Sequence, residues 1–207
     1  MTEQTGGDAR RRVLNVGGNN HEIALPAHFN GWQHLLLDID PAGQPDIVCD
    51  ARELQRLDGA TMDAVHCAHN LEHYHRHEVR RVLAGFRHVL KPDGFCEIRV
   101  PDIGEVMRQS VARGLDIDDT LYESGAGPIT VRDVIYGWGA EVERSGNDFY
   151  CHKTGFTPKA MISVLTEAGF GTVYCGSGNL EVRAIAFVAK PTPFHLQLLG
   201  IAPPPGS

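Results

Sequence analysis

The sequence lacks the features that mark several large classes of protein. Its 207 residues include five cysteines without a Cys-x-x-Cys spacing, so the usual zinc-binding and dithiol motifs are absent. No apolar run reaches the roughly 20 residues that a membrane-spanning helix needs. No internal repeat or low-complexity tract is present, which excludes a solenoid. A single globular domain is the simplest interpretation of this chain length.

Positive charge is also scarce. The chain has 19 Lys and Arg against 26 Asp and Glu, a formal net charge of −7. Nucleic-acid binding depends on clustered cations that contact phosphates; we interpret the basic run Arg10-Arg11-Arg12 as a solvated terminus and expect no nucleic-acid partner. Unpaired cysteines without a secretory apolar segment fit a reducing compartment, so we expect a cytoplasmic protein without a membrane span.

The most informative stretch is the block from Met62 to Asp102. Met62–Ala68 and Phe95–Val100 are apolar enough for two buried strands. Apolar residues recur between them at helical spacing, at Val79, Val82, Leu83, Phe86, Val89 and Leu90. Lys91-Pro92-Asp93-Gly94 is expected to end this helix and turn the chain. The block therefore predicts a βαβ unit with a right-handed connection.

Polar residues directly follow both strands of this unit. They are His69-Asn70 after the first strand and Pro101-Asp102 after the second. Because open parallel sheets bind ligands at the carboxyl ends of their strands, we expect these residues to line the site.

The amino-terminal half predicts three further strands, at Arg12–Val16, His34–Ile39 and Asp46–Cys49. Only Asp40–Pro45 separates the last two, whereas a parallel crossover usually needs about a dozen residues or more. Asn19–Asn30 is also poor in helical periodicity. We therefore expect a reduced amino-terminal half that lacks helices common in larger doubly wound sheets.

A helix is expected after Asp102, with Ile103, Val106, Met107 and Val111 on its buried face. The following segment, residues 114–150, is rich in glycine and has no clear period. It is long for a structureless loop inside a compact domain, so it is expected to be partly helical or a functional lid.

The carboxyl-terminal part predicts one more helix and a hairpin. Thr157-Pro158 supplies an N-cap and a first helical residue, and Gly169 ends the helix. Its expected buried face consists of Met161, Ile162, Leu165 and Ala168. Strands at Thr172–Cys175 and Val182–Ala189 are expected to form a hairpin around Gly176-Ser177-Gly178-Asn179.

These elements predict the domain organisation. Residues 1–207 should form a single domain, with a lid insertion at residues 114–150. The proline-rich end, residues 202–207, is expected to be a disordered tail.

The central block resembles the class I S-adenosylmethionine (SAM)-dependent methyltransferases, and most closely a bacterial subgroup of short type 11-like enzymes. The residues that carry this resemblance are Asp63-Ala64, Leu71-Glu72-His73, Val89 to Gly94, Leu14-Asn15-Val16-Gly17, Gly31-Trp32, Asp38-Ile39-Asp40 and His152-Lys153-Thr154-Gly155-Phe156. It covers roughly Val13 to Ala189. The resemblance implies an α/β, Rossmann-like class I fold, with a mostly parallel sheet, a C-terminal antiparallel hairpin and a reduced N-terminal half.

The resemblance also implies that the turn after the first strand contacts SAM, through Asn15, Gly17 and Gly18. Glycine there lets backbone N–H groups approach a ligand closely. The family usually has an acidic residue where Asn15 stands, and a third glycine that is absent here. A plain strand-to-loop turn explains these residues equally well.

Further cofactor contacts are expected after the next strands. Asp38, with Ile39, is placed to accept the ribose hydroxyls, although Asp38 also suits a turn. The resemblance implies that Asp50 accepts the adenine amino group while the backbone N–H of Ala51 contacts the ring; alternatively, Asp50 caps a short helix. His69 corresponds to the position that faces the methionine part of SAM.

Several histidines close together raise the question of a metal site. They are His66, His69, His73, His75 and His77. No defined third ligand accompanies them, so we expect no metal site. His73 belongs to the Leu-Glu-His element of the family and is expected to hold the loop.

His152 is the candidate catalytic residue, since a base with a near-neutral pKa assists methyl transfer to a hydroxyl or amine. The competing interpretation is a structural histidine that holds its loop. The sequence thus predicts a SAM-dependent methyltransferase with a small-molecule acceptor (a sugar, glycan or secondary metabolite), and a homodimer is compatible with it. A nicotinamide-dependent Rossmann oxidoreductase and a non-catalytic SAM-fold scaffold protein are the alternatives.

Overall fold

The structure is a computed structural model that describes residues 10–125 and 127–202. Its main feature is a seven-stranded sheet with the order β3-β2-β1-β4-β5-β9-β8. The strands are β1 (Arg12–Val16), β2 (Gln33–Asp38), β3 (Ile47–Val48), β4 (Met62–Ala68), β5 (Leu90–Pro101), β8 (Thr172–Gly178) and β9 (Glu181–Phe187). The first five run parallel, and β9 pairs antiparallel with both β5 and β8. The predicted mostly parallel sheet with a C-terminal antiparallel hairpin is confirmed.

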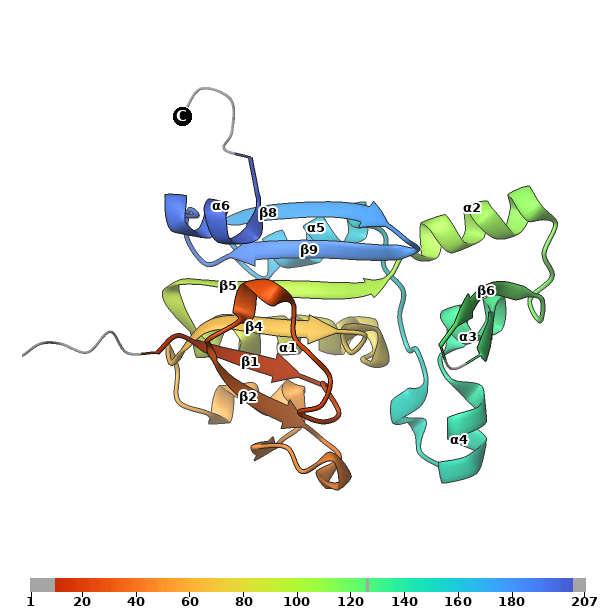
Figure 1. Ribbon diagram of the computed structural model, residues 1–207, viewed down its shortest axis with the longest axis horizontal. Helices are drawn as coiled ribbons and strands as arrows, with labels where there is room; N and C mark the ends of the chain where they lie inside the picture. The colour runs from red at the N-terminus through yellow and green to blue at the C-terminus, as the bar shows by residue number, and fades with distance from the viewer. Residues whose placement is uncertain (1–9, 126, 203–207) are drawn as a thin grey trace, which may run out of the picture.

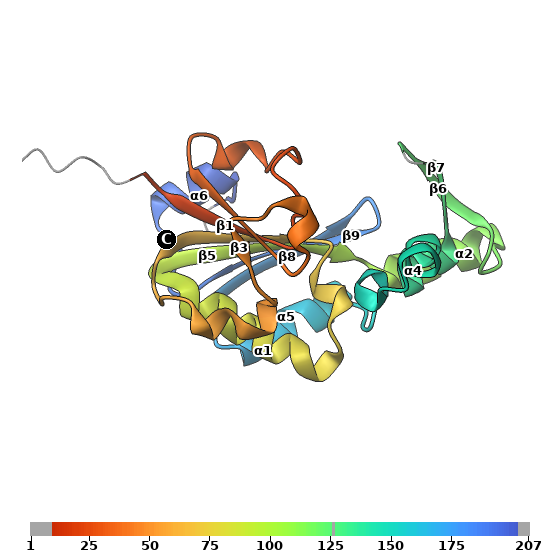
Figure 2. The same cartoon turned by 90° about the horizontal axis from the view of Figure 1, so that it is seen from below.

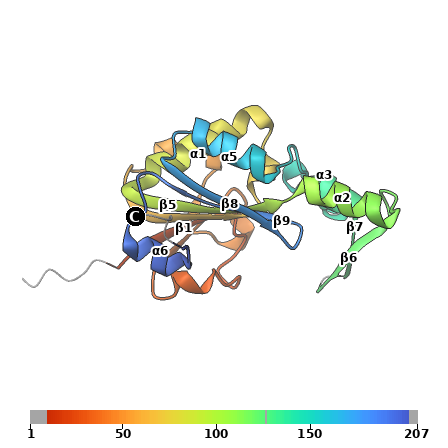
Figure 3. The same cartoon turned by 90° about the horizontal axis from the view of Figure 1, so that it is seen from above.

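Helices cover both faces of this sheet (Figures 2 and 3). On one face lie α1 (Arg76–Val89) and α5 (Pro158–Glu167), whose apolar side chains pack into the larger core. The predicted stripe of α1 is fully buried, whereas Ile162 of α5 is exposed. The other face is covered by α6 (Pro193–Leu199), which the sequence analysis did not predict.

The amino-terminal half is reduced, as expected. Short 3-10 helices stand where crossover helices would be: η1 (Ala27–Phe29) between β1 and β2, η2 (Pro41–Gly43) between β2 and β3, and η3 (Ala51–Arg56) after β3. Phe29 of η1 stacks on Phe95 of β5, with 6.1 Å between ring centroids. One buried aromatic ring thus covers part of the sheet face that a longer helix would occupy.

Two predicted turns differ in the structure. Lys91–Gly94 does not separate α1 from the next strand but bulges within β5, because Met62 pairs with Leu90 and Ala64 with Phe95. In the hairpin, β8 extends through Gly178, and the turn consists of Asn179 and Leu180, both with positive φ. Two consecutive residues at positive φ give the tight turn that matches the twist of paired strands.

Residues 103–150, here called the arm, project beyond the carboxyl ends of the parallel strands (Figure 1). The arm contains α2 (Ile103–Arg113), β6 (Thr120–Ser124), β7 (Gly127–Thr130), α3 (Val131–Tyr136), α4 (Gly139–Ser145) and η5 (Asp148–Tyr150). It has its own small core around Val106, Leu121 and Val134. The predicted lid segment therefore has secondary structure, including a hairpin that the sequence did not indicate.

The predicted buried face of α2 is only partly correct, because Met107 is exposed and Val111 is 84% exposed. The helix projects from the sheet, so only one side of it meets other arm residues. Among the described residues, none of the helices combines the length and apolar character required to cross a bilayer. Of the predicted tail, only Ala202 is described, and it is exposed; residues 203–207 lie outside the described part.

Candidate functional site

The predicted site residues gather at the carboxyl ends of β1, β2, β3 and β4, on the side of the sheet from which the arm extends (Figure 1). The parallel pairing of these strands places their following loops along one edge. Two zones can be distinguished there. The loops after β1, β2 and β3 form the cofactor edge, and the loop after β4, the segment around His152 and the arm form the acceptor edge.

The glycine turn after β1 is tightly packed. Gly17 has a φ of +73°, and a Cβ built on it would lie 2.1 Å from Nδ2 of Asn70. A Cβ on Gly18 would lie 2.0 Å from Nδ2 of Asn15, which is itself buried. A side chain at either glycine would therefore have to displace Asn70 or Asn15, the two asparagines that pack against this turn.

Asp38 is fixed by the backbone around it. Oδ2 accepts a hydrogen bond from the backbone N of Asn19 at 3.1 Å, and Oδ1 accepts one from the backbone N of Asp40 at 2.9 Å. A carboxylate has about four acceptor positions, so both oxygens retain capacity for ribose hydroxyls. Asp38 thus links the loops after β1 and β2, and both of its carboxylate oxygens are held by backbone N–H groups.

Asp50 is the N-cap of η3, as one of the two interpretations held, since its side chain accepts a hydrogen bond from the backbone N of Arg52. The guanidinium of Arg52 also contacts both carboxylate oxygens, with Nη2 at 2.5 Å from Oδ2. Burial would raise the pKa of Asp50, but these hydrogen bonds outweigh it and lower the pKa. An adenine amino group would compete with Arg52 for this carboxylate.

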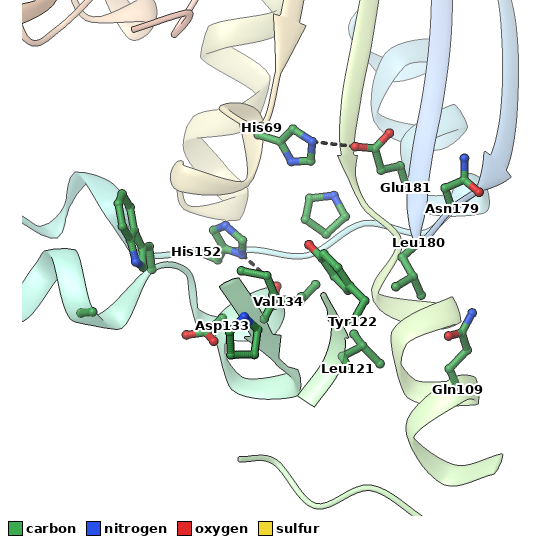
Figure 4. A pocket seen from close by; sticks show the side chains of 15 residues that line it. His69, Gln109, Leu121, Tyr122, Asp133, Val134, His152, Asn179, Leu180 and Glu181 are labelled. Atoms are coloured by element: carbon green, nitrogen blue, oxygen red, sulfur yellow. Dashed lines mark hydrogen bonds and ion pairs between the residues drawn. The ribbon is translucent and has the colours of Figure 1, made fainter. Parts of the chain in front are cut away.

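A cavity of about 950 Å³ lies at the acceptor edge, between the sheet and the arm (Figure 4). Its polar lining includes His69, Gln109, Asp133, His152, Asn179 and Glu181, and its apolar lining includes Leu121, Tyr122, Ile129, Val134, Trp138 and Leu180. No lysine or arginine of the described chain lines it. Of the residues predicted to line the site, His69, Pro101 and His152 belong to this cavity; the predicted residues of the cofactor edge are not among its lining residues.

His69 lies between two carboxylates. Its Nε2 lies 2.7 Å from Oε1 of Glu181, and its Nδ1 lies 3.5 Å from Oε1 of Glu72. Figure 4 shows the His69 ring pointing toward Glu181. The hydrogen bond with Glu72 is the main reason why the pKa of His69 is raised to about 9, so the ring is cationic at neutral pH. No sequence pattern pointed to Glu181, which begins β9 in the C-terminal hairpin.

His152 points its free ring nitrogen into the acceptor edge. Its Nδ1 lies 2.9 Å from the backbone O of Val134, which can only accept, so Nδ1 carries the proton and Nε2 a lone pair in the neutral ring. Burial lowers the pKa of His152 below its usual 6.5. The ring is therefore neutral at pH 7 and can take up a proton at Nε2.

Glu72 and His73 lie directly beside His152. His73 is held by a hydrogen bond from its Nδ1 to the backbone O of Cys151 at 3.0 Å, which agrees with the predicted loop-holding role. Glu72 is buried, and its Oε1 lies 4.0 Å from Nε2 of His152. One acceptor atom from each residue lies within 4.8 Å of the others. The sequence analysis missed Glu72 because it treated Leu-Glu-His as one structural element.

Asp102 does not line the site as expected. It is completely buried, caps α2 through the backbone N of Glu105, and accepts a 2.5 Å hydrogen bond from the hydroxyl of Ser177. An aspartate after a strand thus serves here to begin the arm. Pro101, the preceding residue, does line the cavity.

Comparisons with known proteins agree with this fold. Residues 12–98 match the family model of a methyltransferase domain. No curated protein sequence matches the chain. A SAM-dependent methyltransferase structure from Archaeoglobus fulgidus is 16% identical, with a TM-score of 0.54 over 86% of each chain.

Two further solved structures come from Burkholderia thailandensis. One is 1,6-didemethyltoxoflavin-N1-methyltransferase with bound 1,6-didemethyltoxoflavin and S-adenosylhomocysteine, at 19% identity and a TM-score of 0.50, covering 87% of this chain and 72% of the other. The other is an O-methyltransferase family protein at 13% identity and a TM-score of 0.50, covering 87% and 52%. At such identities these structures share the fold.

The strand order and the position of the site define a Rossmann-like class I fold. Residues 12–98, about two fifths of the chain, carry the methyltransferase domain, and the whole fold is shared with SAM-dependent methyltransferases, one of which has S-adenosylhomocysteine bound; both findings support a SAM-dependent methyltransferase with SAM as its cofactor. The family resemblance of the central block is thereby confirmed.

Proposed function

We propose that this enzyme transfers the methyl group of SAM to a small-molecule acceptor bound in the cavity at the acceptor edge. The observation that carries the proposal is the position of this cavity, which begins at His69 beyond β4 and is closed on its other side by the arm. A methyl acceptor must approach the sulfonium from the side opposite its leaving sulfur, so it needs a separate compartment next to the cofactor.

SAM would bind along the cofactor edge, with Asp38 and Ile39 at the ribose, Asp50 and Ala51 at the adenine, and His69 at the methionine part. Asn15, Gly17 and Gly18 would form the turn beneath it. The close packing around Gly17 and the backbone hydrogen bonds to Asp38 support this assignment, because both restrict the loops to one arrangement. The guanidinium of Arg52 would leave Asp50 when adenine binds.

His152 would accept the proton that the acceptor loses. Its fixed Nδ1, its unprotonated Nε2 and its place in the cavity lining support this role. The predicted lid, residues 114–150, would close over the acceptor and exclude water from the methyl group. The chain would act as one domain in which this segment moves about its two connections.

The acceptor would be a small molecule rather than a nucleic acid. The cavity lining contains carboxylates and aromatic rings but none of the arginines or lysines among the described residues, which a phosphate backbone would need. The fold neighbours include an N-methyltransferase and an O-methyltransferase family protein. A hydroxyl and an amine therefore both remain candidate acceptors at this point.

Ligand binding tests the proposal. Thermal shift with SAM, S-adenosylhomocysteine (SAH) and NAD should show stabilisation by the first two, because a ligand at 100 times its Kd adds about 2.7 kcal/mol to the free energy of unfolding. A screen with methyl-labelled SAM and small hydroxyl and amine compounds would then detect transfer. Stabilisation by NAD alone would favour an oxidoreductase, and SAH binding without transfer to any compound would favour a scaffold.

A further inference from the structure

Three side chains that carry hydrogen-bond acceptors converge at the acceptor edge. Glu72 is 1% exposed; among the described residues its Oε1 has the ring of His69 at 3.5 Å, and its Oε2 has no hydrogen-bond partner. His73 and His152 both use Nδ1 to donate to backbone oxygens, so each presents a lone pair at Nε2 in its neutral form. Buried acceptors of this kind require a donor, and its absence is destabilising.

The number and spacing of these acceptors favour a nitrogen donor. A hydroxyl offers one hydrogen to three acceptors, whereas an amine offers two and an ammonium three. Two hydrogen bonds from one tetrahedral nitrogen span up to about 4.6 Å between acceptors, while neighbouring ligands of a zinc or magnesium ion lie only about 3.0–3.4 Å apart. The 4.0 Å between Glu72 Oε1 and His152 Nε2 exceeds the metal range and lies within the amine range.

Charge at this edge also favours a group that becomes positive. Glu72 and Glu181 both contact His69. The pKa of His69, raised to about 9 chiefly by Glu72, makes it the single cation between two carboxylates at neutral pH. One negative charge is left uncompensated, and the rest of the cavity lining supplies no lysine or arginine.

The cavity reaches this cluster at His152, and Glu72 and His73 lie behind His152, with one acceptor atom of each residue within 4.8 Å of the others. Tyr122 and Trp138 line the cavity, and Trp138 is 59% exposed, which leaves its ring free for a ligand. Figure 4 shows Tyr122 extending from the arm toward His69. Aromatic walls of this kind bind flat rings. We propose that the methyl acceptor is an amine carried on an aromatic or similarly flat group, with its nitrogen bound by Glu72, His73 and His152; this inference rests on the proposed function.

The arrangement suits N-methylation. The amine enters neutral, with its N–H groups donating to Glu72 and His73. Its lone pair attacks the methyl carbon, the new C–N bond forms as the C–S bond breaks, and the electron pair of that bond stays on sulfur to give SAH. Positive charge moves from sulfur to nitrogen, where the carboxylate of Glu72 stabilises it in the transition state. One N–H proton then passes to Nε2 of His152 and from there to water, leaving the methylated neutral amine.

Paired probes test this inference. Benzylamine and benzyl alcohol differ only in the donor group, and their affinities for the SAH-loaded full-length protein can be compared by calorimetry or ligand-observed NMR. Benzylamine should bind the wild-type protein about tenfold more tightly than benzyl alcohol. Glu72→Gln, which keeps the shape but removes the charge, should abolish this preference, and the exposed arm variant Glu143→Gln should retain it.

Each other outcome has a defined meaning. Equal affinities, no binding of either probe, or a preference that survives Glu72→Gln would overturn the inference. Stoichiometric Zn²⁺ binding by the wild-type protein that is lost in Glu72→Gln would assign the cluster to a metal instead. Because the wild-type comparison needs no variant, a folding defect in Glu72→Gln would not obscure the result. If SAH itself does not bind, the proposed function fails; if SAH binds without amine preference, only this inference fails.

Discussion

The carboxylates of the two edges differ in the hydrogen bonds that they accept from the rest of the protein. At the cofactor edge, Asp38 accepts two backbone hydrogen bonds and Asp50 is held by Arg52. At the acceptor edge, Glu72 is more deeply buried, has only the ring of His69 near its Oε1, at 3.5 Å, and has no described hydrogen-bond partner at its Oε2. The first arrangement sets orientation and leaves spare acceptor capacity, which suits a ligand held the same way in every turnover. The second arrangement leaves a buried carboxylate oxygen without a hydrogen-bond donor. Such an oxygen suits a ligand group that donates a hydrogen bond and becomes positively charged.

The largest effect is expected at the acceptor edge, from His152→Ala. Loss of a positioned general base should lower kcat by about 100-fold, measured with the acceptor found in the screen. SAH affinity, measured by calorimetry, should stay within about twofold because His152 lies outside the cofactor edge. His77→Ala, at an exposed histidine, is the matched control. Full activity in His152→Ala would return this residue to its structural interpretation.

The cofactor edge should be most sensitive at its glycine turn. Gly17→Ala combines a positive φ with a Cβ 2.1 Å from Asn70, so SAH affinity should fall by about tenfold or more. Gly31→Ala is a close control, since Gly31 has a φ of +84° but nothing within 4 Å of a Cβ. If both variants bind SAH equally, the close approach at Gly17 has no role in cofactor binding.

The arm should respond to ligands while the sheet does not. Its separate small core and exposed apolar side chains indicate lower local stability than the sheet, so limited proteolysis of the apo protein should cut within residues 114–150 first. SAH with acceptor should slow this cleavage by roughly threefold or more. Identical cleavage rates with and without ligands would count against a lid.

A smaller effect is expected from pH. His152 has a lowered pKa because of burial, and only its neutral form can take up a proton. We therefore expect kcat to fall as the pH is lowered, and we expect the profile of kcat against pH to have its midpoint below 6.5. His152→Ala should remove this midpoint. A midpoint above 6.5, or one that persists in the variant, would show that another group controls the rate.

Local sequence patterns predicted the sheet and α1, because the residues that indicate each of these elements lie close together in the sequence. The strands at Arg12–Val16 and Met62–Ala68 match their predicted bounds, and the short connections indicated the reduced half. The arm and α6 were harder, because the small core of the arm combines residues from several short elements, such as Leu121 and Val134, which share no local period. The turn predicted at Lys91–Gly94 was also wrong, because these residues form a bulge within β5, which pairs with β4 on both sides of it.

The candidate site divides in the same way. Sequence position alone placed Asp38 and His69 at the strand ends, since that position follows from the βαβ pattern. It could not show that His69 meets Glu181, more than a hundred residues away, or that Glu72 is buried beside His152. Such contacts depend on how the arm and hairpin return to the sheet, which no local pattern encodes.

The most direct test of the account is one calorimetric series, in which SAH is titrated into the wild-type protein, Asp38→Ala and His152→Ala. If the cofactor edge and the acceptor edge are separate, Asp38→Ala should weaken SAH binding by about tenfold, or about 1.4 kcal/mol, while His152→Ala changes it by no more than about twofold. Equal SAH affinity in all three proteins, or a larger loss in His152→Ala than in Asp38→Ala, would contradict the assignment of the two edges.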